Sequence, residues 1–154
     1  MLWNILIVLV LFAGAASPAD LTLDSKEAAP GTTVTLAIRL AAQDAALTGL
    51  QADFEFAGDV MEVTAAVGPA AAEVEKQLIG KVAGTGRYRL MLIGFNRNRI
   101  GDGEVALITI QLNADAAGNY LLRLTGVTGT DADGNPISLR SAPATLRVRP
   151  GGGS

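Results

Sequence analysis

Two carboxylates at alternate positions, Asp53 and Glu55, form the pattern in this sequence most open to a chemical interpretation. In an extended strand, residues two positions apart project from the same face, so these side chains would lie next to each other. Such a pair can act as acid and base in glycoside hydrolysis. Two carboxylates on a solvated strand face are the simpler interpretation. We therefore expect Asp53 and Glu55 to belong to a partner-binding surface and to have no catalytic role.

The residue inventory argues against catalysis more generally. The 154 residues include no histidine and no cysteine. Histidine is the usual general base near neutral pH and the commonest metal ligand, and both residues take part in nucleophile–base dyads. The sequence also carries no phosphate-binding or dinucleotide-binding glycine motif. We predict that the protein is not an enzyme and that it needs no organic cofactor.

One short segment has spacing compatible with a metal ion. Asp131, Asp133 and Asn135 follow the Asp-x-Asp-x-Asn order in which calcium loops place their oxygen ligands. However, Gly134 stands fourth in the segment, where an EF-hand has its glycine sixth, and no glutamate closes the loop. A plain turn is the favoured interpretation, and a weak calcium site at the three residues is the alternative.

A second candidate binding segment lies at the end of an apolar run. Phe95, Arg97 and Arg99 place one aromatic ring and two guanidinium groups close together in the sequence. This combination suits stacking on a sugar or pairing with an acidic partner. The net charge of −3, without a basic run, gives no reason to expect a nucleic-acid partner.

A series of alternating strands must position these residues. After residue 20, apolar and polar residues alternate with a period of two, and turn signals separate the segments. The pattern predicts an all-β protein, a two-sheet antiparallel β-sandwich of about nine strands, whereas residues 70–77 stay unassigned between helix, strand and loop. The expected strands cover residues 21–24, 33–40, 50–56, 60–64, 87–95, 105–112, 120–127 and 144–148.

The N-terminus has the layout of a secretory signal peptide. Residues 2–12 are apolar except for one asparagine, and small residues follow up to position 19. Cleavage after Ala15, Ala16 or Ala19 would fit, and the last is preferred because the strand pattern starts directly after it. We expect a signal peptide over residues 1–19, a domain over residues 20–149 and a glycine-rich tail over residues 150–154. An uncleaved leader acting as an anchor is the alternative, since the segment contains no lysine or arginine and is short for a membrane span.

Four landmarks in a fixed order resemble those of the cohesin family, the receptor modules that bind dockerins in extracellular assemblies. They are a Pro-Gly turn before an alternating strand, a phenylalanine-rich strand leading to a Glu-Val pair, a Gly-Asp-Gly before a strand, and an Asp-Gly-Asn before the last strands. In this sequence they occupy residues 30–36, 54–63, 101–110 and 133–137. The second landmark departs from the family, because Ala57, Gly58 and Asp59 stand where a Tyr-Asp is expected. The resemblance implies a jelly-roll sandwich, related to some carbohydrate-binding modules, in which one sheet face carries the partner.

Three functions remain open from the sequence. The leading hypothesis is a secreted or cell-surface cohesin-like module that binds a protein partner such as a dockerin, with a link to polysaccharide degradation. A carbohydrate-binding module is the first alternative, although the single tryptophan lies in the leader and only two tyrosines are present. A structural subunit of an extracellular fibre, assembled through edge strands, is the second.

Overall fold

Eleven strands and one helical turn make up the part of the chain that the computed structural model describes, residues 19–150. The segments on which the leader and the end of the glycine-rich tail were expected, residues 1–18 and 151–154, lie outside the described residues. The elements are β1 (Ala19–Leu23), β2 (Lys26–Ala28), β3 (Thr33–Ala41), β4 (Gly49–Glu55), β5 (Met61–Val67), α1 (Pro69–Ala72), β6 (Gln77–Gly84), β7 (Arg87–Ile93), β8 (Gly103–Leu112), β9 (Gly118–Thr130), β10 (Pro136–Ser141) and β11 (Ala144–Val148).

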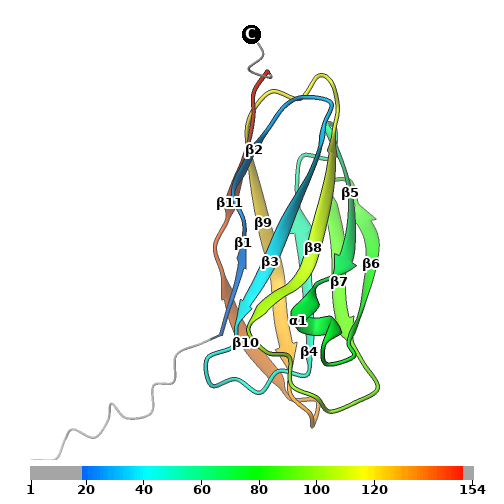
Figure 1. The fold of residues 1–154 in the computed structure, drawn as a ribbon, viewed down its shortest axis with the longest axis vertical. Coiled ribbons are helices and arrows are strands. Elements are labelled where there is room, and N and C mark those ends of the chain that lie inside the picture. The colour runs from blue at the N-terminus through cyan, green and yellow to red at the C-terminus, as the bar shows by residue number, and fades with distance from the viewer. Residues whose placement is uncertain (1–18, 151–154) are drawn as a thin grey trace, which may run out of the picture.

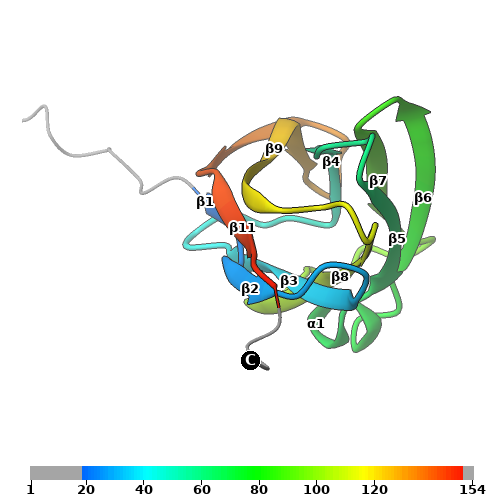
Figure 2. The same ribbon diagram turned by 90° about the horizontal axis from the view of Figure 1, so that it is seen from above.

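The strands form two layers that face each other across one core (Figures 1 and 2). One layer follows the order β5-β8-β3-β1, and the other follows β10-β9-β4-β7-β6. The layers are joined because β1 pairs with β10, and β11 adds to β9 and carries β2 on its other side. The strand path ends at β5 and β6, so the sandwich is a flattened barrel that stays open between these two strands.

Period-two alternation explains which side chains fill the core. In β4, Leu50, Ala52 and Phe54 are buried, while the residues between them point to solvent. In the opposite layer, Leu36 and Ile108 are fully buried and stand opposite each other in the register of β3 and β8. Apolar side chains from both layers therefore meet in one continuous cluster, as expected for aligned sheet packing.

Glycine permits the chain reversals at two of the sequence landmarks. Gly31, in the turn before β3, has a φ of 73°, and Gly134, in the turn between β9 and β10, has a φ of 83°. Residues with a Cβ rarely adopt this left-handed region. The positions of Pro30-Gly31 and Asp133-Gly134 in the sequence thus correspond to turns that require glycine.

The all-β sandwich is confirmed, and the structure adds details that alternation did not reveal. The eight expected segments correspond to β1, β3, β4, β5, β7, β8, β9 and β11, whereas β2, β6 and β10 were not expected as separate strands. Two pairs are parallel, β1 with β10 and β2 with β11, so the sheet is not antiparallel throughout. Both parallel pairs join the start of the domain to its end, a long-range arrangement that local sequence patterns do not encode.

Two boundaries differ in detail from the sequence expectation. The unassigned residues 70–77 cover most of α1, which begins one residue earlier at Pro69, and a turn that leads into β6 at Gln77. Ala19 was placed in the leader, yet it is the first residue of β1, is 1% exposed and pairs with Leu139. Ala19 thus takes part in β1, and the cleavage site of the leader stays a prediction.

Candidate binding face

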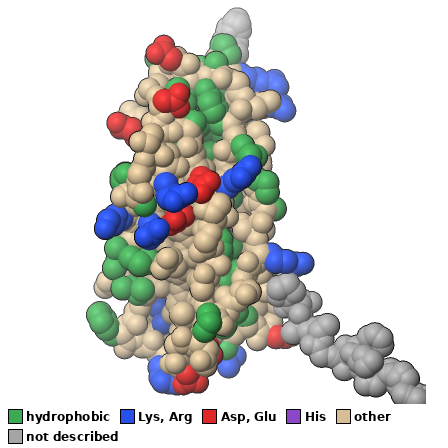
Figure 3. Space-filling model, turned by 180° about the vertical axis from the view of Figure 1, so that it is seen from behind, with side chains coloured by type: hydrophobic (Ala, Val, Ile, Leu, Met, Phe, Trp, Pro, Cys, Tyr) green, Lys and Arg blue, Asp and Glu red, His purple; other side chains and the backbone are tan. Residues whose placement is uncertain are grey.

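The solvent side of β9, β4, β7 and β6, called the outer face below, carries Asp53 and Glu55 at its centre. In the register of β4 with β7, Asp53 stands opposite Arg89, and Glu55 stands opposite Arg87. On the other side of β4, Glu55 stands opposite Arg123 of β9. The alternation of β4 thus places both carboxylates among basic side chains, as Figure 3 shows at mid-height of this face.

Both carboxylates are held in cross-strand ion pairs. The Asp53 carboxylate accepts two hydrogen bonds from Arg89, from Nε at 2.8 Å and from a terminal nitrogen at 3.1 Å. Glu55 accepts from Arg87 at 3.1 Å and from the Thr125 hydroxyl at 2.9 Å. The hydrogen bonds from Arg89 hold the pKa of Asp53 below its ordinary value, and those to Asp53 raise the pKa of Arg89. An ionised, fully paired Asp53 is suited to fixing the surface and unsuited to donating a proton.

Apolar side chains occupy the lower half of the outer face. Met91 and Ile79 stand opposite each other on β7 and β6, and Ile93 follows on β7. Ile79 and Ile93 are each 42% exposed, and Phe95, just beyond β7, is fully exposed. Figure 3 shows apolar side chains below the charged ones along the edge that β6 and β7 form. We call Ile79, Met91, Ile93 and Phe95 the apolar cluster.

A shallow groove runs beside the apolar cluster at the start of β4. Gly49 and Gln51 line its floor, with Met91 and Ile93 on the side of β7, and Thr128 and Thr130 on the side of β9. A Cβ at Gly49 would lie 2.7 Å from the Thr130 hydroxyl oxygen and 3.5 Å from the Leu92 carbonyl oxygen. Glycine at position 49 therefore keeps the groove open.

The loop that carries Phe95 is fixed by a buried lysine that the sequence interpretation missed. Lys76 is 3% exposed, and its Nζ donates to the Asn96 side-chain oxygen at 2.7 Å and to the Asn96 carbonyl at 3.2 Å. The Asn96 amide in turn donates to the Val74 carbonyl at 3.3 Å. Burial lowers the pKa of Lys76. The only sequence signal for this contact is a lysine within the unassigned residues 70–77, and a single lysine is too common to be specific.

The far half of the same loop is also anchored. The Ile100 backbone N–H donates to the Leu47 carbonyl at 2.7 Å, and both side chains are buried. The Asp102 carboxylate accepts from the Ala42 backbone N–H at 2.8 Å. Residues 94–102 are thereby held at both ends, so that Phe95 is presented to solvent from a fixed backbone.

Arg97 and Arg99 lie at the lower end of the molecule, away from Asp53. Arg97 donates to Asp133 in the turn between β9 and β10 at 3.0 Å, and both side chains are about 70% exposed. Arg99 is exposed in the same loop. Phe95 lies six positions after Arg89, a span of roughly 20 Å in an extended chain. The structure thus divides the five predicted site residues between the centre of the outer face and its lower end.

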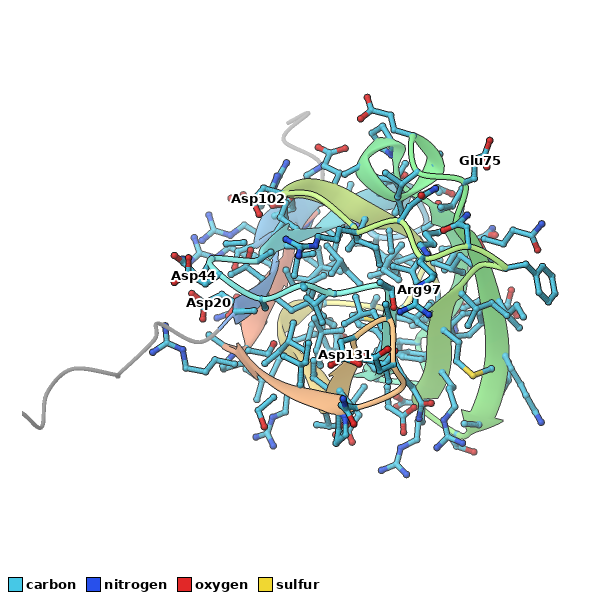
Figure 4. The ribbon with its side chains drawn as sticks, turned by 90° about the horizontal axis from the view of Figure 1, so that it is seen from below. Asp20, Asp44, Glu75, Arg97, Asp102 and Asp131 are labelled. Carbon is cyan, nitrogen blue, oxygen red and sulfur yellow. The ribbon has the colours of Figure 1, made fainter. Side chains whose placement is uncertain are left out.

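The turn of residues 131–135 is organised by its first aspartate. The Asp131 carboxylate accepts hydrogen bonds from the backbone N–H groups of Asp133 and Asn135, each at 2.9 Å, and from the Asn135 side-chain amide at 3.2 Å. These bonds, that of the Asn135 backbone first, lower the pKa of Asp131. Arg97 lies beside Asp131 at this end (Figure 4). The hydrogen bonds of the turn account for the spacing of Asp131, Asp133 and Asn135. The calcium site at these residues stays a prediction. Within residues 19–150, no group of three carboxylate, histidine or cysteine side chains is arranged as a metal site.

Aromatic side chains do not form a planar strip in the described part of the chain. Phe54 and Phe56 stack on each other with ring centroids 5.5 Å apart, and Phe54 is fully buried. Tyr88 lies across Gly80 on β6, and the Tyr120 hydroxyl accepts from the Ala117 N–H at 2.9 Å. Phe95 is thus the one fully exposed aromatic ring between residues 19 and 150.

Comparisons with known proteins identify the class of fold. No protein-family model and no curated protein matches the sequence. Several solved structures match it in three dimensions, and they are cohesins, so the chain is a β-sandwich module with a cohesin-like fold. The likeness extends over most of the chain but not to the sequence, because the identity stays below 20% in the matches described next.

Three of these structures illustrate the similarity in TM-score, sequence identity and coverage. A type I cohesin–dockerin complex of OlpA from Clostridium thermocellum matches with a TM-score of 0.76 and 12% identity, covering 86% of this chain and 100% of that one. The sixth cohesin of scaffoldin B from Acetivibrio cellulolyticus, solved with a Cel5 dockerin, gives 0.75 and 13%, with coverages of 86% and 100%. A non-cellulosomal cohesin of the archaeon Archaeoglobus fulgidus gives a TM-score of 0.73 and 18% identity, with coverages of 86% and 92%.

In residues 19–150, no helix is long and apolar enough to span a membrane.

Proposed function

We propose that this chain is a non-catalytic, exported module of protein–protein assembly that binds a dockerin-type partner on the outer face. The observation that carries the proposal is the outer face itself: a pre-organised array of ion pairs next to an exposed apolar cluster. The cohesin-like fold supports it, because two of the solved neighbours are described as cohesins in complex with dockerins.

The composition of the outer face suits a protein interface. Recognition surfaces between proteins combine an apolar centre with polar groups at the rim, and aromatic side chains often serve as anchors. Here the apolar cluster lies beside the paired Asp53 and Glu55, and Phe95 is the aromatic candidate. Both the strand pairing and the Lys76–Asn96 contact fix these groups before a partner arrives, which reduces the entropy lost on binding.

The carboxylates at the centre of the face support a binding role over a catalytic one. Asp53 is bound by Arg89 through two hydrogen bonds, and Glu55 is shared by Arg87 and Thr125. A general acid needs a proton to give at working pH, whereas the lowered pKa of Asp53 keeps it ionised.

A pull-down from the extracellular proteins of the native organism tests the proposal. The full chain serves as bait, and we expect it to recover a protein that carries a dockerin. Replacing exposed apolar residues of the outer face in Ile93→Gln and Phe95→Ala should abolish that recovery, whereas Ala66→Gln, at an exposed residue of β5 in the opposite layer, should preserve it. Recovery of polysaccharide without a protein partner would overturn the proposal, and so would capture that is unaffected by the two variants.

A further inference from the structure

The outer face differs in charge from the rest of the chain. It carries four basic side chains, Lys81, Arg87, Arg89 and Arg123, but only the two acidic ones at its centre. Its formal charge is thus +2, in a protein whose net charge is −3, which leaves −5 for the remainder. A charge opposite to that of the whole molecule, confined to one face, indicates electrostatic complementarity to a partner.

Two of these basic groups form no ion pair with the described part of the chain. Arg87 and Arg89 are paired with Glu55 and Asp53, whereas neither Lys81 nor Arg123 forms an ion pair among residues 19–150. Lys81 also stands opposite Arg89 in the register of β6 and β7. Like charges at directly opposed positions in neighbouring strands are destabilising. An external carboxylate placed near Lys81 would relieve this repulsion.

The shape of the face complements its charge. The groove over Gly49 has an apolar wall of Met91 and Ile93 and hydroxyl groups on its other side. A protruding apolar side chain fits such a groove, and the remaining members of the apolar cluster extend it toward Phe95. Lys81 and Arg123 flank the part of the same face above the groove, on its two outer strands, β6 and β9.

We propose that the protein partner of the outer face presents an apolar ridge flanked by carboxylates, with the ridge in the Gly49 groove and the carboxylates beside Lys81 and Arg123. This inference rests on the proposed function and adds the chemical character of the partner to it. The partner is acidic where it touches this chain, and the charge of Asp53 and Glu55 is already satisfied by Arg89 and Arg87.

Two synthetic helical peptides test the inference directly. Both carry the same ridge of leucines; one is flanked by glutamates, and the other has every glutamate replaced by lysine. Binding to the full chain is measured by fluorescence anisotropy at several salt concentrations, and the site is mapped by NMR shifts. We expect the glutamate peptide to bind more tightly than the lysine peptide, with affinity that falls as salt rises.

Matched variants separate this effect from unspecific charge attraction. Lys81→Glu and Arg123→Glu should each weaken the glutamate peptide by roughly fivefold to tenfold, as expected for the reversal of an exposed charge contact. Arg147→Glu makes the same change in net charge on β11, where Arg147 stands opposite Asn119 near the start of β9. This variant should bind the glutamate peptide with an affinity within about twofold of that of the native chain. Ile93→Gln should weaken both peptides, whereas Ala66→Gln, on β5 in the opposite layer, should weaken neither.

The possible failures are distinguishable. Equal binding of both peptides, tighter binding of the lysine peptide, or equal effects of Arg123→Glu and Arg147→Glu would overturn the acidic character of the partner. If Ile93→Gln still weakened binding in those cases, the outer face would remain the binding face. Failure of both peptides to shift any resonance of the outer face would overturn this inference, while a dockerin captured in the pull-down would preserve the proposed function.

Discussion

Lys76 shows how one residue can fix the position of a whole surface loop. It is the only buried charged side chain between residues 19 and 150, and it forms hydrogen bonds to Asn96 and none to a carboxylate. Burial of an ammonium group is costly, and hydrogen bonds to oxygen atoms offset part of that cost. The contact holds the backbone next to Phe95. The free-energy cost of burying this ammonium group is therefore associated with a fixed position for part of the candidate binding face.

Substitution at this contact should have unequal effects. Asn96→Ala removes an acceptor while the lysine stays buried, so we expect the free energy of unfolding to fall by about 1–3 kcal/mol. Lys76→Met removes the charge together with its requirement for partners and should cost less. Urea denaturation measures both, with exposed Asn119→Ala as the control, expected within about 0.5 kcal/mol of the native chain. A larger loss for Lys76→Met than for Asn96→Ala would contradict this account of the contact.

Asp53 should make the stability of the protein depend on pH in the acidic range. Its pKa in the folded protein is lowered from an ordinary value of 3.8, chiefly by the hydrogen bonds from Arg89. The ionised form therefore stabilises the fold above pH 3.8, and this contribution is lost as the pH falls through the folded-state pKa.

Melting curves at a series of pH values measure the effect. We expect the difference in Tm between the native chain and Asp53→Asn to be largest above about pH 5 and to shrink below the ordinary pKa. Asp59→Asn, at an exposed position, serves as the control. A difference that grows as the solution becomes more acidic would show that the Asp53–Arg89 pair does not act in this way.

At the residue scale, the sequence predicted on which side of a strand a residue lies better than it predicted which residues are in contact. Alternation correctly placed Asp53 and Glu55 on the solvent side of their strand. It could not identify Arg87, Arg89 or Arg123 as their neighbours, because that requires the pairing of strands distant in the sequence. The Lys76–Asn96 contact was missed for the same reason, since its two residues belong to segments joined only by the fold.

At the scale of elements, strong alternation predicted the long strands, and weak alternation hid the others. β3, β8 and β11 follow the expected segments closely, because one side of each packs on the core. β6 contains glycine at positions 80 and 84 and is mostly exposed, so its sequence shows little period-two contrast. β10 begins directly after the turn of residues 131–135, so its first residues resemble a continuation of the turn. β2 has only three residues, too few to show a clear alternation.

The first strand provides a test of the domain boundary. Ala19 is buried and pairs with Leu139, so a chain that starts at Asp20 loses a residue of β1. We expect a chain that starts at Ser17, as cleavage after Ala16 would produce, to melt about 3 °C higher than one that starts at Asp20. Differential scanning calorimetry of the two forms measures this. Equal Tm values would show that Ala19 contributes nothing to the fold.

The turn between β9 and β10 provides a second test at this scale. Because Asp131 already accepts three hydrogen bonds from its own turn, we expect Asp131→Ala to lower the Tm, whereas addition of calcium or EDTA leaves the native chain unchanged. Thermal melts in both conditions check this. A rise in Tm with calcium that is absent in Asp131→Ala would instead establish a cation site at Asp131, Asp133 and Asn135.

At the scale of the whole molecule, the two layers differ in what they offer to a partner. The layer of β9, β4, β7 and β6 presents the groove, the apolar cluster and an excess of positive charge. The opposite layer of β5, β8 and β3 carries exposed side chains such as Glu62 and Gln111, which stand opposite each other. A cohesin-like fold explains how such a sandwich is built, and the outer face of this particular chain explains what it would recognise.

Hydrogen–deuterium exchange of the full chain, alone and with the protein captured in the pull-down, tests the central claim most directly. The amides of β4, β6, β7 and β9 and of residues 94–99 should exchange more slowly in the complex, while those of β3, β5 and β8 should stay unchanged. Protection confined to β3, β5 and β8, or to the turn of residues 131–135, would contradict the assignment of the outer face as the partner-binding surface.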